Sequence, residues 1–283
     1  NRAASLTRRK KSRIIGFIAN DLLEVPYTFD LIRGAQQVAW ERNIELMVLN
    51  VNEDRYSVEK AAEHLMEHRV EGIVYAAMYH HEVELPEIMQ ECPLVLANCF
   101  CKDTRYASIV PDEVQAAEVI TKELLNNGYK RIAFLNLNET IIAAQYRKQG
   151  AINAFEKSNV PLENLHVQSV IHGPSGYEVS TLRQSAEKII NTFKPDAILC
   201  GQDPMAVEVY FVIQEMGLQV GKDIGIASFD DWDVIPSLLR PALSTMALPH
   251  LEMGAWAIQY LLDGRTDKAL EKLPFNLIKR NSY

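Results

Sequence analysis

The chain has 283 residues, of which 48% are hydrophobic and 23% charged, so its composition is that of a folded globular protein of about two domains. No apolar run is long enough for a typical transmembrane helix. The formal net charge is −8, yet residues 1–13 carry six Lys and Arg residues and no acid, so the remainder carries −14 and would not bind nucleic acid by itself. The basic start is either a nucleic-acid-binding segment or a solvated linker. It has neither an initiator Met nor an apolar signal-peptide core, so we expect a segment of a longer protein.

The first part of the chain alternates between strand and helix patterns. Short apolar runs bounded by turn residues predict buried parallel strands, and a 3.6-residue apolar period predicts helices. The first helix is expected to carry Ile32, Ala35 and Ala39 on one face. Strands are predicted at 13–20, 45–51, 72–78 and 93–99, and a second helix at about 56–69.

The alternation then restarts. A helix with Val114, Ile120 and Leu124 on one face is expected to stop at Gly128, and Asp203 is expected to cap a helix that ends at Gly217. Further helices are predicted at about 141–158, 175–193 and 250–263. Strands are predicted at 131–137, 166–171, 197–201, 224–229, 244–249 and 273–280. Two rounds of this kind predict an α/β protein with two doubly wound parallel-sheet subdomains.

Polar residues stand at five of the predicted strand ends, in both halves of the chain. Ligands of open parallel sheets bind beyond the carboxyl ends of the strands. Each single Asn or Asp is more often a turn or helix-capping residue, but the recurrence predicts one ligand cleft between two facing sheets. The polar ends are Asn20-Asp21, Asn98, Asn136, Gln202-Asp203 and Asp230-Asp231.

Motifs for covalent chemistry are not found in the sequence. There is no glycine-rich nucleotide loop and no G-x-S-x-G elbow, so we expect no cofactor and favour a binding protein over an enzyme. Asp230 and Asp231 are weak candidates for a glycosidase pair, because neighbouring strand residues point apart. No ligand-spaced Cys and His set predicts a metal site. The four cysteines, none in a C-x-x-C pair, are expected to be reduced thiols of a cytoplasmic protein: Cys92, Cys99, Cys101 and Cys200.

Seven motifs follow one another along essentially the whole chain. They are NRAASL (1–6) with RIIGFIAN (13–20), RVEGIVYAAM (69–78), NNGYKRIAFL (126–135), Arg147 with Gly150, GQDPMAVEVY (201–210), GLQVGKDIGIASFDD (217–231) and LIKRNSY (277–283). This ordered set resembles the lactose/galactose repressor (LacI/GalR) family of bacterial transcription factors. Within the family, the repressors of sucrose and raffinose utilisation look most similar at VLANC (95–99), IVPDE (109–113), YRKQG (146–150) and ALPH (247–250).

The resemblance implies two periplasmic-binding-protein-like (type I) subdomains joined by three crossovers near 110–113, 240–244 and 270–274. The amino-terminal subdomain would comprise 13–111 and 243–271. The carboxyl-terminal subdomain would comprise 112–242 and 272–283. Residues 1–12 would be the remnant of the hinge, and the family's amino-terminal helix-turn-helix domain is not part of this sequence.

The resemblance also implies a set of effector-binding residues around the cleft. Arg147 is the strongest, because a planar guanidinium suits adjacent hydroxyls, although such a residue on a helix is otherwise often a surface charge. Asp230 would accept from hydroxyl groups, and Tyr27 and Trp232 would offer flat faces to a sugar ring, although a lone aromatic more often packs in a core. The remaining candidates have ordinary turn, capping or exposed first-turn roles as alternatives: Asn20, Asp21, Asn98, Asp112, Gln202 and His250. Gln202 and Ser228 replace the family's Asn and Gly, so the effector cannot be copied from another member.

The hinge carries a separate implication of the resemblance. In the family this segment becomes a helix on operator DNA, where a leucine wedges into the minor groove and bends the duplex. That residue is Leu6 here, and Ala4 and Ser5 beside it are small enough to pack against a dimer mate. So short a segment cannot hold a helix alone, and we expect 1–12 to be mobile without DNA.

The function implied is that of a cytoplasmic, homodimeric, sugar-responsive transcriptional regulator, with a repressor as the expected type. Its partners would be a carbohydrate effector, namely sucrose, raffinose or a hexose part of these, and operator DNA, which it would contact through the hinge and the helix-turn-helix domain. An extracytoplasmic sugar-binding protein of a transporter has the same cleft architecture and is the alternative. A glycoside-processing enzyme is a distant third.

Overall fold

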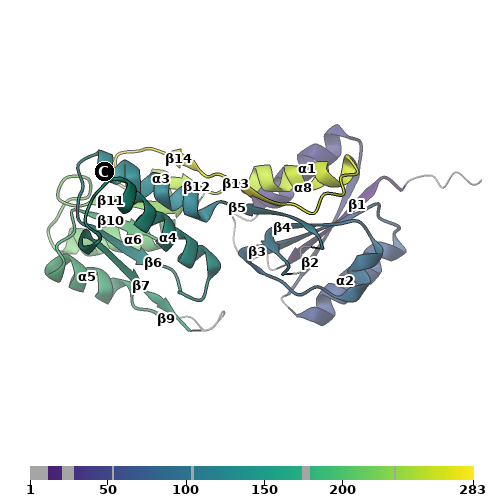
Figure 1. Cartoon of the computed structure of the whole chain (residues 1–283), viewed down its shortest axis with the longest axis horizontal. Helices are drawn as coiled ribbons and strands as arrows, with labels where there is room; N and C mark the ends of the chain where they lie inside the picture. Colours follow the sequence, from purple (N-terminus) through teal and green to yellow (C-terminus); the bar gives the residue numbers. More distant parts are fainter. Residues whose placement is uncertain (1–11, 21–28, 53, 103–104, 174–178, 233) are drawn as a thin grey trace, which may run out of the picture. The chain divides into compact units, whose positions relative to one another are not determined.

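Two α/β units make up the chain in the computed structural model, which describes residues 12–20, 29–52, 54–102, 105–173, 179–232 and 234–283 (Figure 1). The first unit comprises Asn1–Val110 and His250–Lys272, and the second comprises Pro111–Pro249 and Leu273–Tyr283. The chain therefore passes between the units three times, and each unit is built from segments distant in sequence.

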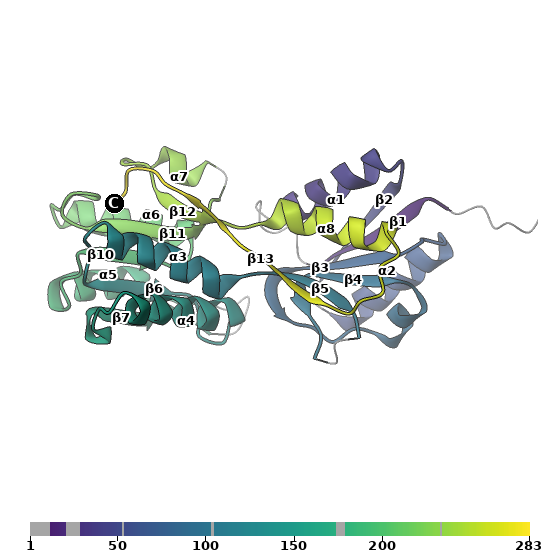
Figure 2. The ribbon, with the colours of Figure 1, turned by 45° about the horizontal axis from the view of Figure 1, so that its top comes forward.

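The first unit contains one six-stranded sheet with the strand order β13-β5-β4-β3-β1-β2. The pairs β1–β2, β1–β3, β3–β4 and β4–β5 are all parallel. Helices α1 and α8 lie on one face of this sheet and α2 on the other (Figure 2). The elements are β1 (Ile14–Asn20), α1 (Phe29–Glu41), β2 (Glu45–Val51), α2 (Arg55–Glu67), β3 (Ile73–Glu82), η3 (Glu87–Glu91), β4 (Leu94–Phe100), β5 (Ala107–Pro111), α8 (His250–Leu262) and β13 (Leu270–Leu273).

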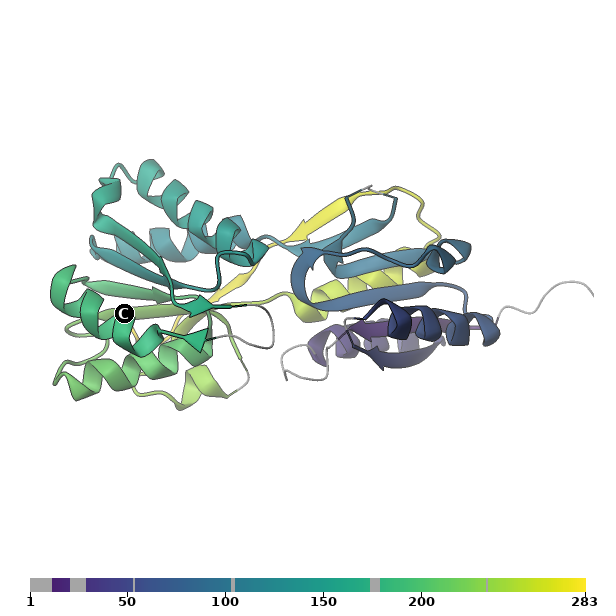
Figure 3. The same ribbon diagram turned by 90° about the horizontal axis from the view of Figure 1, so that it is seen from below.

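The second unit contains a six-stranded sheet with the order β14-β12-β11-β10-β6-β7, in which only β14 is antiparallel to its neighbour. Helices α3 and α4, teal in Figure 3, cover one face, and the green helices α5 and α6 cover the other. The main elements are α3 (Glu113–Asn126), β6 (Ile132–Asn136), α4 (Ile142–Lys157), β7 (Leu165–Ser169), α5 (Leu182–Thr192), β10 (Ala197–Cys200), α6 (Asp203–Glu215), β11 (Gly225–Asp230), β12 (Ser244–Ala247) and β14 (Asn276–Ile278). The minor ones are η4 (Leu162–Asn164), β8 (Ile171–His172), β9 (Val179–Ser180) and α7 (Ile235–Leu238).

Close helix packing in both units depends on glycine. A Cβ at Gly34 of α1 would lie 1.9 Å from the Leu251 carbonyl oxygen, and one at Gly254 of α8 would lie 1.9 Å from the Leu31 carbonyl oxygen. A Cβ at Gly150 of α4 would likewise lie 2.2 Å from a carbonyl oxygen of α3. The helix backbones therefore touch at these points, which only glycine permits.

The predicted fold class is confirmed, since both sheets are parallel-dominated and covered by helices on both faces. Several element predictions are wrong in detail. The strand β5 was not expected, and the expected helix at 175–193 begins only at Leu182. The expected strand at 273–280 is only β14, at Asn276–Ile278, and Leu273 ends a separate strand, β13, which belongs to the other sheet.

The second passage between the units lies later in the chain than expected. Residues 243–249 were expected in the first unit, but β12 pairs in parallel with β11 and so belongs to the second sheet. The passage falls between Pro249 and His250. The hydrogen-bonded strand ladder, rather than the resemblance, sets this boundary.

Candidate functional site

A buried arginine lies at the carboxyl edge of the second sheet. Arg147 of α4 is 3% exposed, and its Nε donates to Glu113 Oε2 at 2.6 Å while its Nη1 donates to the Gly201 carbonyl oxygen at 2.6 Å. Its Nη2 lies 3.8 Å from Asp230 Oδ1, and its guanidinium carbon lies 4.3 Å from the centre of the Phe229 ring. The guanidinium is thus held on its edge by ion pairs and hydrogen bonds and on its face by an aromatic ring.

Four elements bring this cluster together. Glu113 opens α3, whose N-cap Asp112 accepts a hydrogen bond from the Gln115 backbone N–H at 3.1 Å. Gly201 follows β10, and Asp230 ends β11, so both lie where parallel strands terminate. The close packing of α3 on α4 then places the Arg147 guanidinium beside these strand ends. Charged groups that are 34 or more residues apart in sequence therefore meet in one buried position.

Asp230 is the member of the cluster with an acceptor to spare. Its Oδ2 is buried and has no hydrogen-bond partner among the described residues, and its φ of 113° lies in a region that L-residues rarely adopt. Burial raises the pKa of Asp230 to about 8, against the lowering effect of Arg147 and with further raising by Asp203 and Glu113. Asp230 thus combines a strained backbone with a buried acceptor that has no hydrogen-bond partner among the described residues.

The raised pKa of Asp230 predicts how stability depends on pH. Because this pKa is higher in the folded than in the unfolded chain, folding takes up a proton. The contribution of this proton uptake to the free energy of unfolding is fully present below about pH 4, the ordinary carboxyl pKa, and is lost as the pH rises through about 8. Asn mimics the protonated acid at every pH. We therefore expect the free energy of unfolding to decrease less between pH 6 and pH 9 in Asp230→Asn than in the wild type.

Urea denaturation at a series of pH values measures this difference. The exposed Asp263, replaced by Asn, serves as the control. Its free energy of unfolding should change with pH by the same slope as that of the wild type. Equal slopes for Asp230→Asn and the wild type would contradict the assignment of a raised pKa to Asp230.

A second buried carboxylate shapes the turn after β11. Asp203 is fully buried and accepts from the Ser228 hydroxyl, from the Thr245 hydroxyl at 2.8 Å and from the Trp232 backbone N–H at 2.6 Å. The expectation that Asp203 caps α6 is therefore wrong: Gln202 occupies the N-cap position, and its side chain makes no cap hydrogen bond. Asp203 instead holds the backbone that presents Asp230, and burial raises its pKa.

Two predicted residues lie in the first unit at the corresponding strand edge. Asn98 has a φ of 59°, and its Nδ2 donates to the Ala77 and Met78 carbonyl oxygens at 3.0 and 2.9 Å, where the β3–β4 register shifts. It therefore has a structural role in the sheet. Asn20 is 3% exposed, and its Oδ1 has no hydrogen-bond partner in the described part of the chain. Asn20, like Asp230, has a buried acceptor to spare.

The remaining predicted residues are placed as follows. His250 begins α8 and is buried, so it is not the solvent-exposed first-turn residue considered as an alternative. Trp232 is partly buried and follows β11. Five further candidates lie outside the described residues, namely Asp21 and Tyr27 of the effector set and Ala4, Ser5 and Leu6 of the hinge, as does the expectation that residues 1–11 are mobile.

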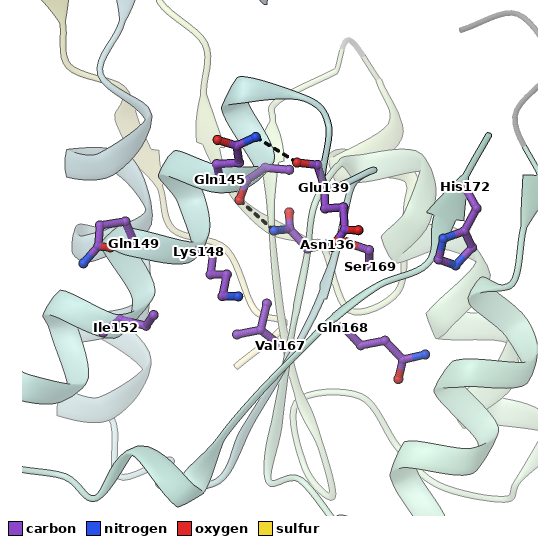
Figure 4. Close-up of a pocket in the computed structure, with 11 residues that line it drawn as sticks. Asn136, Glu139, Gln145, Lys148, Gln149, Ile152, Val167, Gln168, Ser169 and His172 are labelled. Atoms are coloured by element: carbon purple, nitrogen blue, oxygen red, sulfur yellow. Dashed lines mark hydrogen bonds between the residues drawn. The ribbon is translucent and has the colours of Figure 1, made fainter. Parts of the chain in front are cut away.

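A polar pocket of about 640 Å³ lies on the side of α4 that faces β7 (Figure 4). Of its lining residues, only Asn136 was singled out from the sequence, as a polar strand end. The others come from α4, β7 and the segments beside them, and no local motif encodes their proximity. The Asn136 side chain donates to the Ala144 carbonyl oxygen at 2.8 Å and so ties the end of β6 to α4. The polar lining residues include Asn136, Glu139, Gln145, Lys148, Gln149, Gln168, Ser169 and His172.

Three further properties bear on the type of site. Among the described residues, no group of three or more His, Cys, Asp or Glu side chains is placed to hold a metal ion. All four cysteines are free thiols. Within the described ranges, no helix has both the length and the apolar character needed to cross a membrane.

Comparison with known proteins gives consistent matches over nearly the whole chain. Residues 12–262 match the family model described as periplasmic binding proteins and sugar binding domain of the LacI family. The chain is 28% identical to the sucrose operon repressor of Escherichia coli over 96% of this chain and 82% of that protein, and 26% identical to the ribose operon repressor of Escherichia coli (strain K12) over 87% and 74%. A crystal structure described as a LacI-family regulator protein from Rhizobium etli superposes with a TM-score of 0.90 at 27% identity, over 96% of this chain and 99% of that one.

Proposed function

Because the chain belongs to the family of periplasmic binding proteins and LacI sugar-binding domains, we propose that it is the effector-binding part of a sugar-responsive transcriptional regulator. The regulator is a repressor of a carbohydrate-utilisation operon, acts in the cytoplasm as a homodimer, and takes sucrose, raffinose or a hexose part of these as its effector. Relatives named as operon repressors support this function over that of a transporter's binding protein. A role in binding rather than catalysis follows from the same relatives.

The arrangement around Asp230 is the observation that carries the proposal. A sugar presents several hydroxyl groups, each of which needs an acceptor when it is buried. The Asp230 Oδ2 is such an acceptor, and Asp203 fixes the backbone beside it. In the first unit, Asn20 offers a second unused acceptor. We therefore keep Asp230, Arg147, Asn20, Asp112 and Gln202 as proposed effector-binding residues.

The other predicted residues complete the proposed set. Asn98, Trp232 and His250 stay in the proposed effector-binding set because they lie at strand or helix ends. Asp21 and Tyr27 come from the segment after β1. The hinge residues Ala4, Ser5 and Leu6 would contact operator DNA. Effector and operator binding are then reciprocally coupled, so a sugar that lowers operator affinity must itself bind less tightly to the operator complex.

A panel of uncharged sugars tests the proposal by thermal shift. The panel contains sucrose, raffinose, melibiose, fructose, glucose and galactose, with mannitol as a control for the general stabilising effect of polyols. A ligand at about a hundred times its dissociation constant should stabilise the chain by about 2.7 kcal/mol. One or two sugars are expected to raise the melting temperature well above the mannitol value. An equal rise in melting temperature with every sugar and with mannitol would contradict a sugar effector.

A further inference from the structure

The buried groups around Arg147 contain more acid than base. The carboxylates of Glu113, Asp203 and Asp230 are all at least 95% buried, and Arg147 is the one buried cation among the described residues of this cluster. The shortest contact of the guanidinium is with Glu113, at 2.6 Å. Its second short contact is with a backbone carbonyl oxygen, at 2.6 Å. The Arg147 charge is thus already matched inside the protein.

We infer that Glu113 sets the charge selectivity of this site, so that the site takes an uncharged, hydroxyl-bearing effector and rejects sugar phosphates and sugar acids. This inference rests on the proposed function of the site as an effector-binding site. It adds a residue that the sequence analysis did not single out and a chemical restriction on the ligand.

The donors of Arg147 are already engaged in a way that disfavours an anionic ligand. A phosphate or carboxylate binds where free N–H donors and net positive charge are available, as with an unpaired arginine. At this site the Nε and Nη1 of Arg147 already donate to Glu113 and to Gly201. Stacking on the Phe229 ring, with Phe275 also within 5.8 Å, holds the guanidinium plane in place. An anion that recruited the Nε or Nη1 of Arg147 would have to break hydrogen bonds that are already buried, and one that approached Nη2 would meet the Asp230 carboxylate, whose Oδ1 lies 3.8 Å from it.

Protonation of the two aspartates does not make the cluster positive. Burial raises the pKa of Asp230 to about 8, so this carboxylate can bind a proton near neutral pH, and burial also raises the pKa of Asp203. Even with both protonated, Glu113 balances Arg147 and the cluster is neutral. With either one ionised, the cluster is negative. No protonation state of the two aspartates gives the positive charge that would attract an anion, and weak screening in a buried site strengthens the repulsion.

An uncharged sugar can form hydrogen bonds with Asp230 in either of its protonation states. The Asp230 Oδ2 has no partner in the described part of the protein and can accept from a hydroxyl. If Asp230 carries a proton, the same group can donate to a hydroxyl oxygen. A hydroxyl matches both states because it is donor and acceptor, whereas a phosphate dianion offers no donor. The site therefore favours hydroxyl groups at any pH near neutrality.

Binding of matched ligand pairs to the wild type and to Glu113→Gln tests the inference. The pairs are glucose and glucose 6-phosphate, fructose and fructose 6-phosphate, and sucrose and sucrose 6-phosphate, measured by titration calorimetry, with inorganic phosphate as a further probe. Gln keeps the size and the acceptor oxygen of Glu113 but removes its charge. Glu118→Gln is the control, since Glu118 lies on the same helix and pairs with the exposed Lys157.

The wild type is expected to bind the uncharged member of a pair about tenfold or more tightly than its phosphate ester. In Glu113→Gln, the ratio of the ester's dissociation constant to that of the uncharged sugar should be about tenfold smaller than in the wild type. Alternatively, the variant should bind an ester or inorganic phosphate that the wild type does not bind. Glu118→Gln should keep the wild-type ratio.

An ester that binds the wild type as tightly as its uncharged partner would overturn the inference but leave the sugar-binding function intact. An unchanged ratio in a folded Glu113→Gln would also overturn it. No binding of either class to either protein would overturn both the inference and the proposed function. Should Glu113→Gln fail to fold, the wild-type ratio alone decides.

Discussion

Replacing Arg147 with Ala is expected to lower the free energy of unfolding by about 3–5 kcal/mol, because it leaves buried carboxylates without their counter-charge. Glu113 loses its partner at 2.6 Å, and Asp230 loses the nearby positive charge that lowers its pKa. The Gly201 carbonyl oxygen loses a hydrogen bond, and the Phe229 ring loses the group stacked on it. The variant should also lose the response to the effector sugar.

Urea denaturation of Arg147→Ala beside Lys157→Ala measures the effect. Lys157 lies on the same helix in an exposed ion pair, which contributes about 0–1 kcal/mol. Adding Glu113→Gln to Arg147→Ala should restore part of the lost stability, since the orphaned carboxylate is then gone. A loss no greater than that of Lys157→Ala, or no recovery in the double variant, would show that this ion pair does not hold the cluster.

Gly254→Ala is expected to destabilise the first unit by about 1–3 kcal/mol or more, through overpacking of α8 against α1. The added Cβ would lie 1.9 Å from the Leu31 carbonyl oxygen and 3.0 Å from the Ala35 backbone nitrogen. Both atoms belong to a helix backbone, so the helices must move apart. Because α8 begins at His250, this shift would also displace a proposed effector residue.

Thermal denaturation compares Gly254→Ala with Gly72→Ala. At Gly72 the nearest atoms, at 3.1 Å, are the Cδ atoms of the Leu261 side chain, which can change rotamer. The Gly72 variant should therefore lose clearly less stability than the Gly254 variant. Equal losses would mean that backbone contact between the helices is not the cause.

Periodicity in the sequence was sufficient to predict most of the fold. Buried parallel strands such as β1 and β11 are continuous apolar runs, and helices such as α3 end at a glycine, so both leave local signals. The strand β5 was missed although it is no shorter than the predicted strands β6 and β10, and only its pairing with β4 identifies it as part of the sheet. The place where the chain returns to the first unit was missed because it depends on the pairing of β12.

The candidate site was predictable only in part. That polar residues end the strands follows from the sequence, and Asp230 was found in this way. On its helix alone, Arg147 looked like a surface charge, and only the resemblance pointed to it as a site residue. Its ion pair with Glu113 crosses 34 residues and depends on helix packing, which no local pattern encodes. Asn98 shows the opposite case, because a polar strand residue stabilises an irregular sheet edge.

The most direct test of the account is titration calorimetry with the sugar that shifts the melting temperature most. The wild type, Asp230→Ala and Asp230→Asn are compared at pH 7, since Ala removes both carboxyl oxygens whereas Asn keeps an acceptor and a donor, as a protonated Asp230 does. We expect saturable binding of that uncharged sugar by the wild type, about tenfold or greater weakening in Asp230→Ala, because a buried hydroxyl loses its hydrogen-bond partner, and a smaller change in Asp230→Asn. Equal affinity in the wild type and a folded Asp230→Ala would contradict the assignment of the effector site to this cluster.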